Sequence, residues 1–178
     1  MIFKGYFLNR KIQALLRTAK TRSHCYRALD DVRYVLILCE VSDRNVVEAC
    51  VRTLKAMKKS VHICVYTQKR NDMQIWDYGY LLVEAKKDIN IWGFPKKNIR
   101  EQLNHLSADM LLDLTGDEYP VMRYLMLQHP ATFKAGAKYA SEKDWYDFSI
   151  VMKEGMHDIA FLFNQIINYL RMIRSKNL

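Results

Sequence analysis

The sequence lacks the short motifs by which common cofactor-binding enzymes are recognised. It contains no GxGxxG and no GxxxxGK[ST], so the glycine-rich backbone cradle that holds nucleotide phosphates is missing. It also contains no HExxH, no CxxC and no GxSxG. We therefore do not expect classical NAD binding or P-loop ATP binding. The spacing predicts no metal site and identifies no catalytic residue, so the cofactor and any enzyme activity stay open.

Long apolar runs and a secretory leader are missing as well. No uninterrupted apolar stretch approaches the roughly 20 residues that cross a bilayer. Residues 1–20 lack the apolar core and the small-residue cleavage site of a signal peptide. No two cysteines have the CxxC spacing. Three of them, Cys39, Cys50 and Cys64, fall within apolar elements, where a free thiol behaves as a small hydrophobe. We expect a cytoplasmic protein with buried thiols.

Positive charge is abundant but dispersed. The chain carries 28 Lys and Arg against 19 Asp and Glu, a formal net charge of +9, and such an excess attracts phosphate-rich partners. Basic residues occur in every segment, however, and they concentrate only in residues 1–22. The aromatic residues between 76 and 95 would suit stacking on single-stranded nucleic acid, but we expect them in the core or at an interface. Nucleic-acid binding is not expected.

Apolar runs alternate with helical periodicities along the 178 residues. The runs at 33–41 and 61–67 show no polar alternation, and apolar residues recur between them at helical spacing. This pattern predicts two parallel strands joined by a helix. Irregular structure with at most a short strand is predicted for residues 68–88. The other predicted elements are a short strand and a turn within 88–97, strands within 108–114, 131–137 and 145–152, helices after Pro95 and Pro120, and a long helix from 156 to about 174.

The alternation predicts a single Rossmann-like α/β domain over residues 31–178, preceded by a basic helical segment over residues 1–30. We expect an open, mainly parallel sheet in the common doubly wound order 3-2-1-4-5, with helices on both faces and a long C-terminal helix. With the cofactor motifs missing, we expect a stand-alone binding or accessory domain. The alternative function is a transferase-like or hydrolytic enzyme.

Four segments carry a resemblance to known families: "VLIL" from residue 35, "INIWGFPKK" from residue 89, "DMLLDLTGDEYPVMRYLMLQHPATFKAGA" from residue 109 and "DFSIVM" from residue 147. The stretch 33–152 resembles a set of short bacterial proteins that form an uncharacterised domain family. Its last two segments also resemble the N-terminal Rossmann domain of the heptosyltransferases of glycosyltransferase family 9. In that family a strand ending in aspartate precedes a helix and a small-residue strand ending in glycine, which matches Asp113 and Gly136.

The chain departs from the heptosyltransferase pattern in two ways. Ser42 and Asp43 stand where that family has a glycine-containing GD turn. In addition, 178 residues leave no room for a second domain that would hold a nucleotide-sugar. The resemblance therefore does not imply a complete glycosyltransferase.

Two predicted turns would face each other at the edge of the sheet. Ligands of open α/β sheets bind beyond the C-terminal ends of the strands, where the strand order reverses, and the predicted order brings the turn after the first strand opposite the turn at 113–118. The candidate ligand-facing residues are Ser42, Asp43, Asp113, Thr115, Gly116 and Asp117. Their carboxylates suit a divalent cation or general acid and base catalysis.

The interpretation that we favour for these residues is structural. Asp113 would bond to the backbone at a strand end, Asp117 and Glu118 would favour the start of the next helix, and Gly116 would permit a turn. Ser42 and Asp43 would supply a cap and an acidic first turn to the helix that follows the first strand. His157 would lie in the first turn of the last helix.

The basic N-terminal segment is the second candidate surface. Its apolar residues lie roughly on one helical side with cations around them, the pattern of helices that lie on anionic membranes. The candidate membrane or partner residues are Phe3, Phe7, Arg10, Lys11 and Arg17. On this interpretation the protein is peripheral on the inner membrane. The alternative, which we expect, is that the helix packs on its own domain, on a second copy in a homodimer, or on another protein partner.

Overall fold

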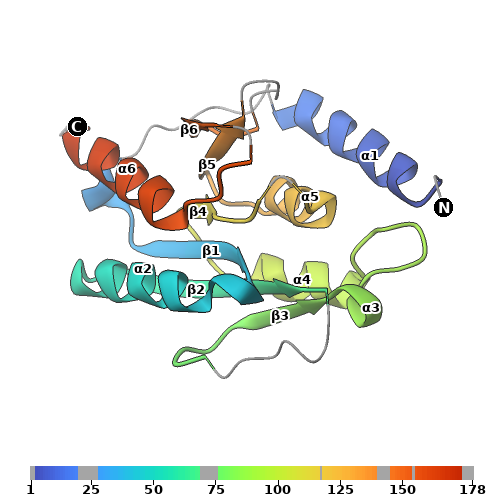
Figure 1. The fold of residues 1–178 in the computed structure, drawn as a ribbon, viewed down its shortest axis with the longest axis horizontal. Coiled ribbons are helices and arrows are strands. Elements are labelled where there is room, and N and C mark those ends of the chain that lie inside the picture. The colour runs from blue at the N-terminus through green and yellow to red at the C-terminus, as the bar shows by residue number, and fades with distance from the viewer. Residues whose placement is uncertain are drawn as a thin grey trace.

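The computed structural model describes residues 3–19, 28–68, 76–116, 118–139, 145–153 and 155–173. Within these ranges strands and helices alternate along the chain (Figure 1). The strands are β1 (Tyr34–Glu40), β2 (Ser60–Thr67), β3 (Leu81–Glu84), β4 (Met110–Asp113), β5 (Phe133–Tyr139) and β6 (Phe148–Met152). The α-helices are α1 (Phe3–Ala19), α2 (Arg44–Ala56), α3 (Ala85–Asp88), α4 (Lys97–His105), α5 (Pro120–Gln128) and α6 (Ile159–Met172), and two short 3-10 helices are η1 (Leu29–Asp31) and η2 (Val41–Asp43).

The strands form one six-stranded sheet in the order β3-β2-β1-β4-β5-β6. Every neighbouring pair is parallel, so the Rossmann-like α/β class is confirmed. The order differs from the expected 3-2-1-4-5 because β6 adds a sixth strand outside β5. Strands β2 and β3 are added on one side of β1, and β4, β5 and β6 are added on its other side. The switch point of the sheet therefore lies between β1 and β4.

The central strands are apolar throughout because both of their faces are covered. In β1, Leu36 and Leu38 contribute to one core and Ile37 and Cys39 to the other, and all four are 0% exposed. Helices α2 and α6 cover one face of the sheet, while α1, α4 and α5 cover the other (Figure 1). A parallel sheet buried on both faces needs such continuous apolar runs.

Helix α1 packs on the domain along its apolar side. Leu8, Ile12 and Leu16 are buried, and Leu8 and Ile12 belong to the same core cluster as residues of α5. The expectation that this helix packs on its own domain is confirmed for that side. None of the described helices combines the length and the apolar character needed to cross a membrane.

The segment 88–97 contains the predicted turn but not the predicted short strand. In place of a strand, the structure has a turn that is closed by an isolated antiparallel bridge between Ile89 and Pro95. Asn90 forms this turn, because its side-chain oxygen accepts hydrogen bonds from the backbone amides of Trp92 and Phe94, at 2.9 and 3.1 Å. The helix that follows begins at Lys97, two residues after Pro95.

Candidate functional site

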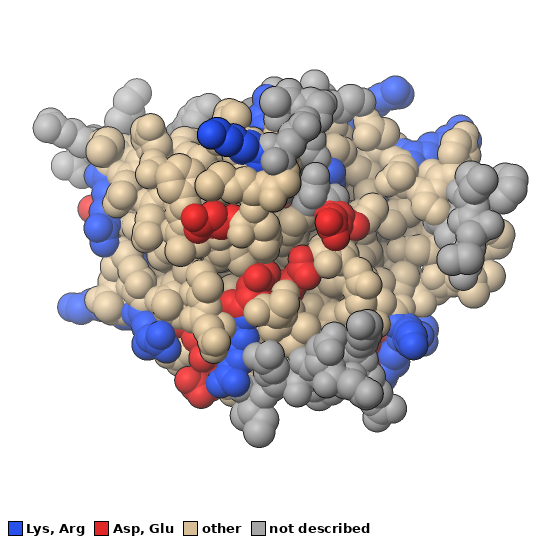
Figure 2. Space-filling view, viewed as in Figure 1, with Lys and Arg blue, Asp and Glu red and all other residues tan. Residues whose placement is uncertain are grey.

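The candidate site lies where β1 and β4 end side by side at the switch point. Leu38 of β1 pairs with Asp113 of β4, and the amide of Leu114 donates to the carbonyl of Leu38 at 2.9 Å. The chain leaves β1 through η2 into α2, and it leaves β4 through a turn into α5. Acidic side chains gather near the middle of this face of the molecule, where β1 ends, while Lys and Arg lie around its edge (Figure 2).

Asp113 is enclosed beneath this surface. Its Oδ1 accepts hydrogen bonds from the amide of Thr115, at 3.0 Å, and from the Thr115 hydroxyl. Its Oδ2 accepts a hydrogen bond from the Tyr146 hydroxyl at 2.9 Å. Burial raises the pKa of the Asp113 carboxyl, and the bonds from Thr115 and Tyr146 oppose that rise. Asp113 therefore ties the turn after β4 to the segment before β6, which is a structural role.

Gly136 of β5 makes room for the ring that covers Asp113. A Cβ atom at position 136 would lie 2.5 Å from Cζ of Tyr146, closer than real Cβ contacts. The glycine thus lets the Tyr146 ring lie flat on β5 and reach Asp113. This contact explains both residues that match the heptosyltransferase pattern, without any ligand.

Glu40, Asp43 and His157 form a second group that opens to solvent. One ligand atom from each of them lies within 4.8 Å of the other two. His157 Nε2 is 3.2 Å from Asp43 Oδ2, and the Tyr119 hydroxyl donates to Glu40 Oε2 at 2.9 Å. Carboxylate oxygen and imidazole nitrogen are both ligands of divalent transition metals. The group therefore has the donor set of a metal site, with its ligand atoms close to one another.

A cavity of about 250 Å³ lies beside this group. Its walls come from the turn after β4, from the end of β5 and from the segment that leads into α6. The lining residues are Glu40, Gly116, Glu118, Tyr119, Tyr139, Gly155, Met156 and His157. Gly155 has φ +73°, a conformation that glycine adopts without strain, and it lets the chain turn toward His157 just before α6.

The site is electronegative although the chain is basic. Burial raises the pKa of Glu40, the neighbouring Asp43 and Glu118 raise it further, and the hydrogen bond from Tyr119 lowers it. No Lys or Arg is among the described residues that line the cavity. Arg44 follows Asp43 in the chain, but its Nε donates to Glu48 at 3.0 Å. Unbalanced carboxylates in a partly buried site favour a cationic ligand.

The structure separates the six residues proposed from the sequence. Asp43 belongs to the open group, and Gly116 lines the cavity, where a Cβ atom would lie 3.7 Å from His157 Nδ1. Asp113 and Thr115 are buried and bonded to each other. Ser42 is exposed and does not line the cavity. Asp117 lies outside the described residues.

Two local predictions at this site were wrong. Ser42 and Asp43 do not give α2 a side-chain cap and an acidic first turn: Asp43 is the N-cap without a side-chain capping bond, and the first turn holds no acidic residue. The Asp43 carboxylate contacts His157 instead. His157 does not lie in the first turn of α6, since that helix begins at Ile159. Asp158 is its N-cap and accepts a hydrogen bond from the amide of Phe161 at 2.9 Å.

Sequence reasoning missed Glu40, Tyr119 and His157 as site residues. Glu40 is the last residue of an otherwise apolar strand, and a charged residue in that place is the one signal that would have marked it. His157 is separated from Asp43 by 114 positions, so no local motif connects the two. The sequence predicted no metal site for this reason, whereas the fold gathers the three ligands from distant segments.

These observations define a Rossmann-like α/β protein with an acidic site at the switch point of its sheet. The chain belongs to a family of unknown function, DUF6913, which it matches over residues 4–173. No curated protein and no solved structure matches it. The resemblance to heptosyltransferases therefore gains no support from relatives.

Proposed function

We propose that the protein is a binding domain that holds a divalent transition-metal ion, such as Zn²⁺ or Mn²⁺, at Glu40, Asp43 and His157. The observation that carries the proposal is the convergence of three ligand atoms within 4.8 Å of one another at the switch point. Ligands of one such ion lie about 2.0–2.2 Å from it and therefore about 3–4.4 Å from each other. Small rotations of these side chains complete that geometry.

The cavity supplies the open coordination position of such an ion. Metal sites that bind or activate a ligand keep one position free of protein groups, and here Glu40 and His157 both line the cavity. With a volume of about 250 Å³, it is smaller than pockets for drug-sized ligands, which span about 300–1,000 Å³. It suits water or a small oxygen-bearing ligand and is too small for a nucleotide-sugar, so the proposal does not extend to glycosyl transfer.

Thermal denaturation of the full chain in the presence of metal ions tests the proposal. An ion at about 100 times its Kd stabilises a protein by about 2.7 kcal/mol, which corresponds to a rise in Tm of about 5 to 10 °C for a chain of this size. After treatment with EDTA, we expect Zn²⁺ or Mn²⁺ to produce this rise. The rise should disappear in Glu40→Gln and in His157→Gln.

Glu101→Gln serves as the matched control, since Glu101 is an exposed carboxylate on α4, outside the candidate site. It should respond to the ion as the unmodified protein does. An equal rise in His157→Gln, or no rise with any divalent ion, would contradict the proposal.

We also propose that the protein works in the cytoplasm. Its described cysteines, Cys39, Cys50 and Cys64, are free and buried. Burial raises the pKa of Cys50 and Cys64 to about 12, so these thiols stay protonated and unreactive. Buried, unpaired thiols are typical of reducing compartments. Labelling with a thiol reagent before and after denaturation tests this state, and a disulfide in the protein purified from its native cells would contradict it.

A further inference from the structure

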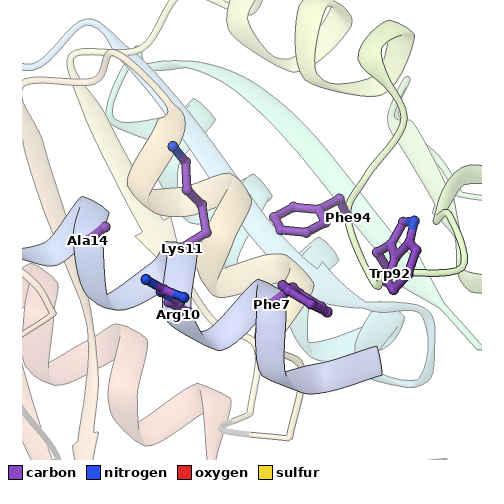
Figure 3. A pocket seen from close by; sticks show the side chains of 6 residues that line it. All are labelled: Phe7, Arg10, Lys11, Ala14, Trp92 and Phe94. Carbon is purple, nitrogen blue, oxygen red and sulfur yellow. The ribbon is translucent and has the colours of Figure 1, made fainter. Parts of the chain in front are cut away.

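The structure leaves an apolar surface uncovered between α1 and the turn at residues 90–94. Phe7 of α1 meets Trp92 of the turn edge to face, with ring centroids 5.4 Å apart, and Phe94 points into the same space (Figure 3). Together with Arg10, Lys11 and Ala14 they line a cavity of about 540 Å³. The sequence marked the helix and the aromatic segment separately, and the fold joins them into one surface.

The tip of this surface consists of large apolar side chains that the fold holds in solvent. Ile91 is 67% exposed and Trp92 is 49% exposed. The turn cannot easily fold them inward, because Asn90 binds the amides of Trp92 and Phe94 and donates its own amide to the carbonyl of Phe94 at 2.9 Å. Gly93, at φ +87°, allows the chain to reverse there. An ordered tip with exposed apolar residues is a feature of contact surfaces.

The charged residues that line the cavity, within the described part of the chain, are both positive. Arg10 and Lys11 line the cavity, and no acidic residue does so among the described part of the chain. Neither cation forms an ion pair within the described residues. Lys96 follows the turn directly and is exposed. Apolar residues and unpaired cations at one place match a partner with anionic groups above an apolar layer.

We propose that this surface docks on an anionic lipid bilayer, with Ile91 and Trp92 entering the interface and Arg10 and Lys11 contacting lipid phosphates. Tryptophan favours the membrane interface because its ring is apolar while its N–H needs a polar partner. Cations at the surface of an anionic membrane each add attraction, which salt weakens. The buried side of α1 stays packed on α5 in this arrangement, so the helix lies on the domain and the bilayer at once. This inference is independent of the proposed metal site.

Co-sedimentation of the full chain with lipid vesicles tests the inference. We expect binding to vesicles of equimolar phosphatidylcholine and phosphatidylglycerol, weaker binding as salt rises, and no binding to phosphatidylcholine alone. Trp92→Ala should lower the partition coefficient about tenfold, because it removes one large apolar side chain from the interface. The double variant Arg10→Ala with Lys11→Ala should lower it by a similar factor.

Matched controls separate the surface from general exposure and charge. Tyr169 on α6 is as exposed as Trp92, at 49%, and Tyr169→Ala should bind vesicles normally. Arg52→Ala with Lys153→Ala removes the same charge elsewhere and should also bind normally. Equal binding to neutral and anionic vesicles, or unchanged binding in both surface variants, would overturn the inference. Self-association that is lost in Trp92→Ala, without vesicle binding, would overturn it too and make a second copy the occupant.

Discussion

The ends of β1 and β4 lie side by side in the sheet, and each carries a carboxylate in a different environment. Asp113 at the end of β4 is 2% exposed, and both of its oxygens accept hydrogen bonds from Thr115 or Tyr146. Glu40 at the end of β1 is only partly buried and accepts a hydrogen bond from Tyr119. Burial raises the pKa of both groups.

The two carboxyl groups, whose pKa values are both raised, differ in their surroundings. Asp113 is held by hydroxyl and amide donors, which occupy the directions from which a ligand would approach. Glu40 lines a cavity together with Glu118 and His157 and has Asp43 nearby, so its negative charge is stabilised by few donors and is open to a cation. A perturbed pKa alone therefore does not identify the functional carboxylate, because structural networks perturb pKa values as well.

The largest expected effect follows from placing a carboxylate at position 112, one residue before Asp113 in β4. Leu112 precedes Asp113 and is 0% exposed, with apolar side chains of the α2 and α6 layer around it. Leu112→Asp would bury a charge without donors, which costs several kcal/mol of a total stability of about 5 to 15 kcal/mol. We expect the variant to be unfolded by circular dichroism. Leu112→Met, which conserves volume, should fold with a loss below about 1.5 kcal/mol. A folded Leu112→Asp protein would show that β4 tolerates charge without partners.

Two glycines, Gly136 within β5 and Gly116 in the turn after β4, give a smaller effect and a direct comparison. Gly136→Ala places a Cβ atom 2.5 Å from the Tyr146 ring, so the ring must move away from Asp113. We expect a loss of about 1–3 kcal/mol in denaturant unfolding, which is typical of an overpacked site. Gly116→Ala meets neighbours only at 3.7 Å or more and should change stability by less than about 0.5 kcal/mol. Equal losses of stability in the two variants would contradict the distinction between the enclosed surroundings of Asp113 and the open surroundings of Glu40.

The sequence predicts most of the fold because the parallel strands are buried on both faces. The apolar run at 33–41 and the run at 108–114 each contain a central strand, β1 and β4, and Pro120 begins α5 as expected. The turn predicted within 88–97 is present, but the short strand predicted beside it was wrong, because Ile89 and Ile91 alternate as in a strand whereas Asn90 binds the following amides and closes the turn. Side-chain bonds of this kind compete with strand formation and leave little trace in an apolar pattern.

The position of the site was predictable, but its chemistry was not. The strand order places a crevice beyond β1 and β4, and Asp43 and Gly116 lie at it. The geometry adds His157, which lies just before α6 and is 3.2 Å from Asp43 through its Nε2 atom. Such contacts depend on how the layers pack, and a single sequence carries no local signal for them.

The smallest expected effect concerns the charge of Glu40 and its dependence on pH. The pKa of Glu40 in the folded protein is raised above its ordinary value of 4.5, so the folded state binds the proton more tightly than the unfolded state. The associated stability is fully present below about pH 4.5 and is lost as the pH rises through the raised pKa. Glu40→Gln imitates the protonated form and keeps that stability at every pH.

We therefore expect metal-free Glu40→Gln to melt at a higher temperature than the unmodified protein at pH 7, with the two values converging toward pH 4. The difference should be on the order of 0.5 kcal/mol, because Glu40 is only partly buried and solvent screens its charge. Melting curves recorded in EDTA across this pH range measure it. A variant that is less stable than the unmodified protein at pH 7 would mean that Glu40, like Asp113, is held by its donors as a structural group. The end of β1 would then carry no unsatisfied negative charge that could bind a cation.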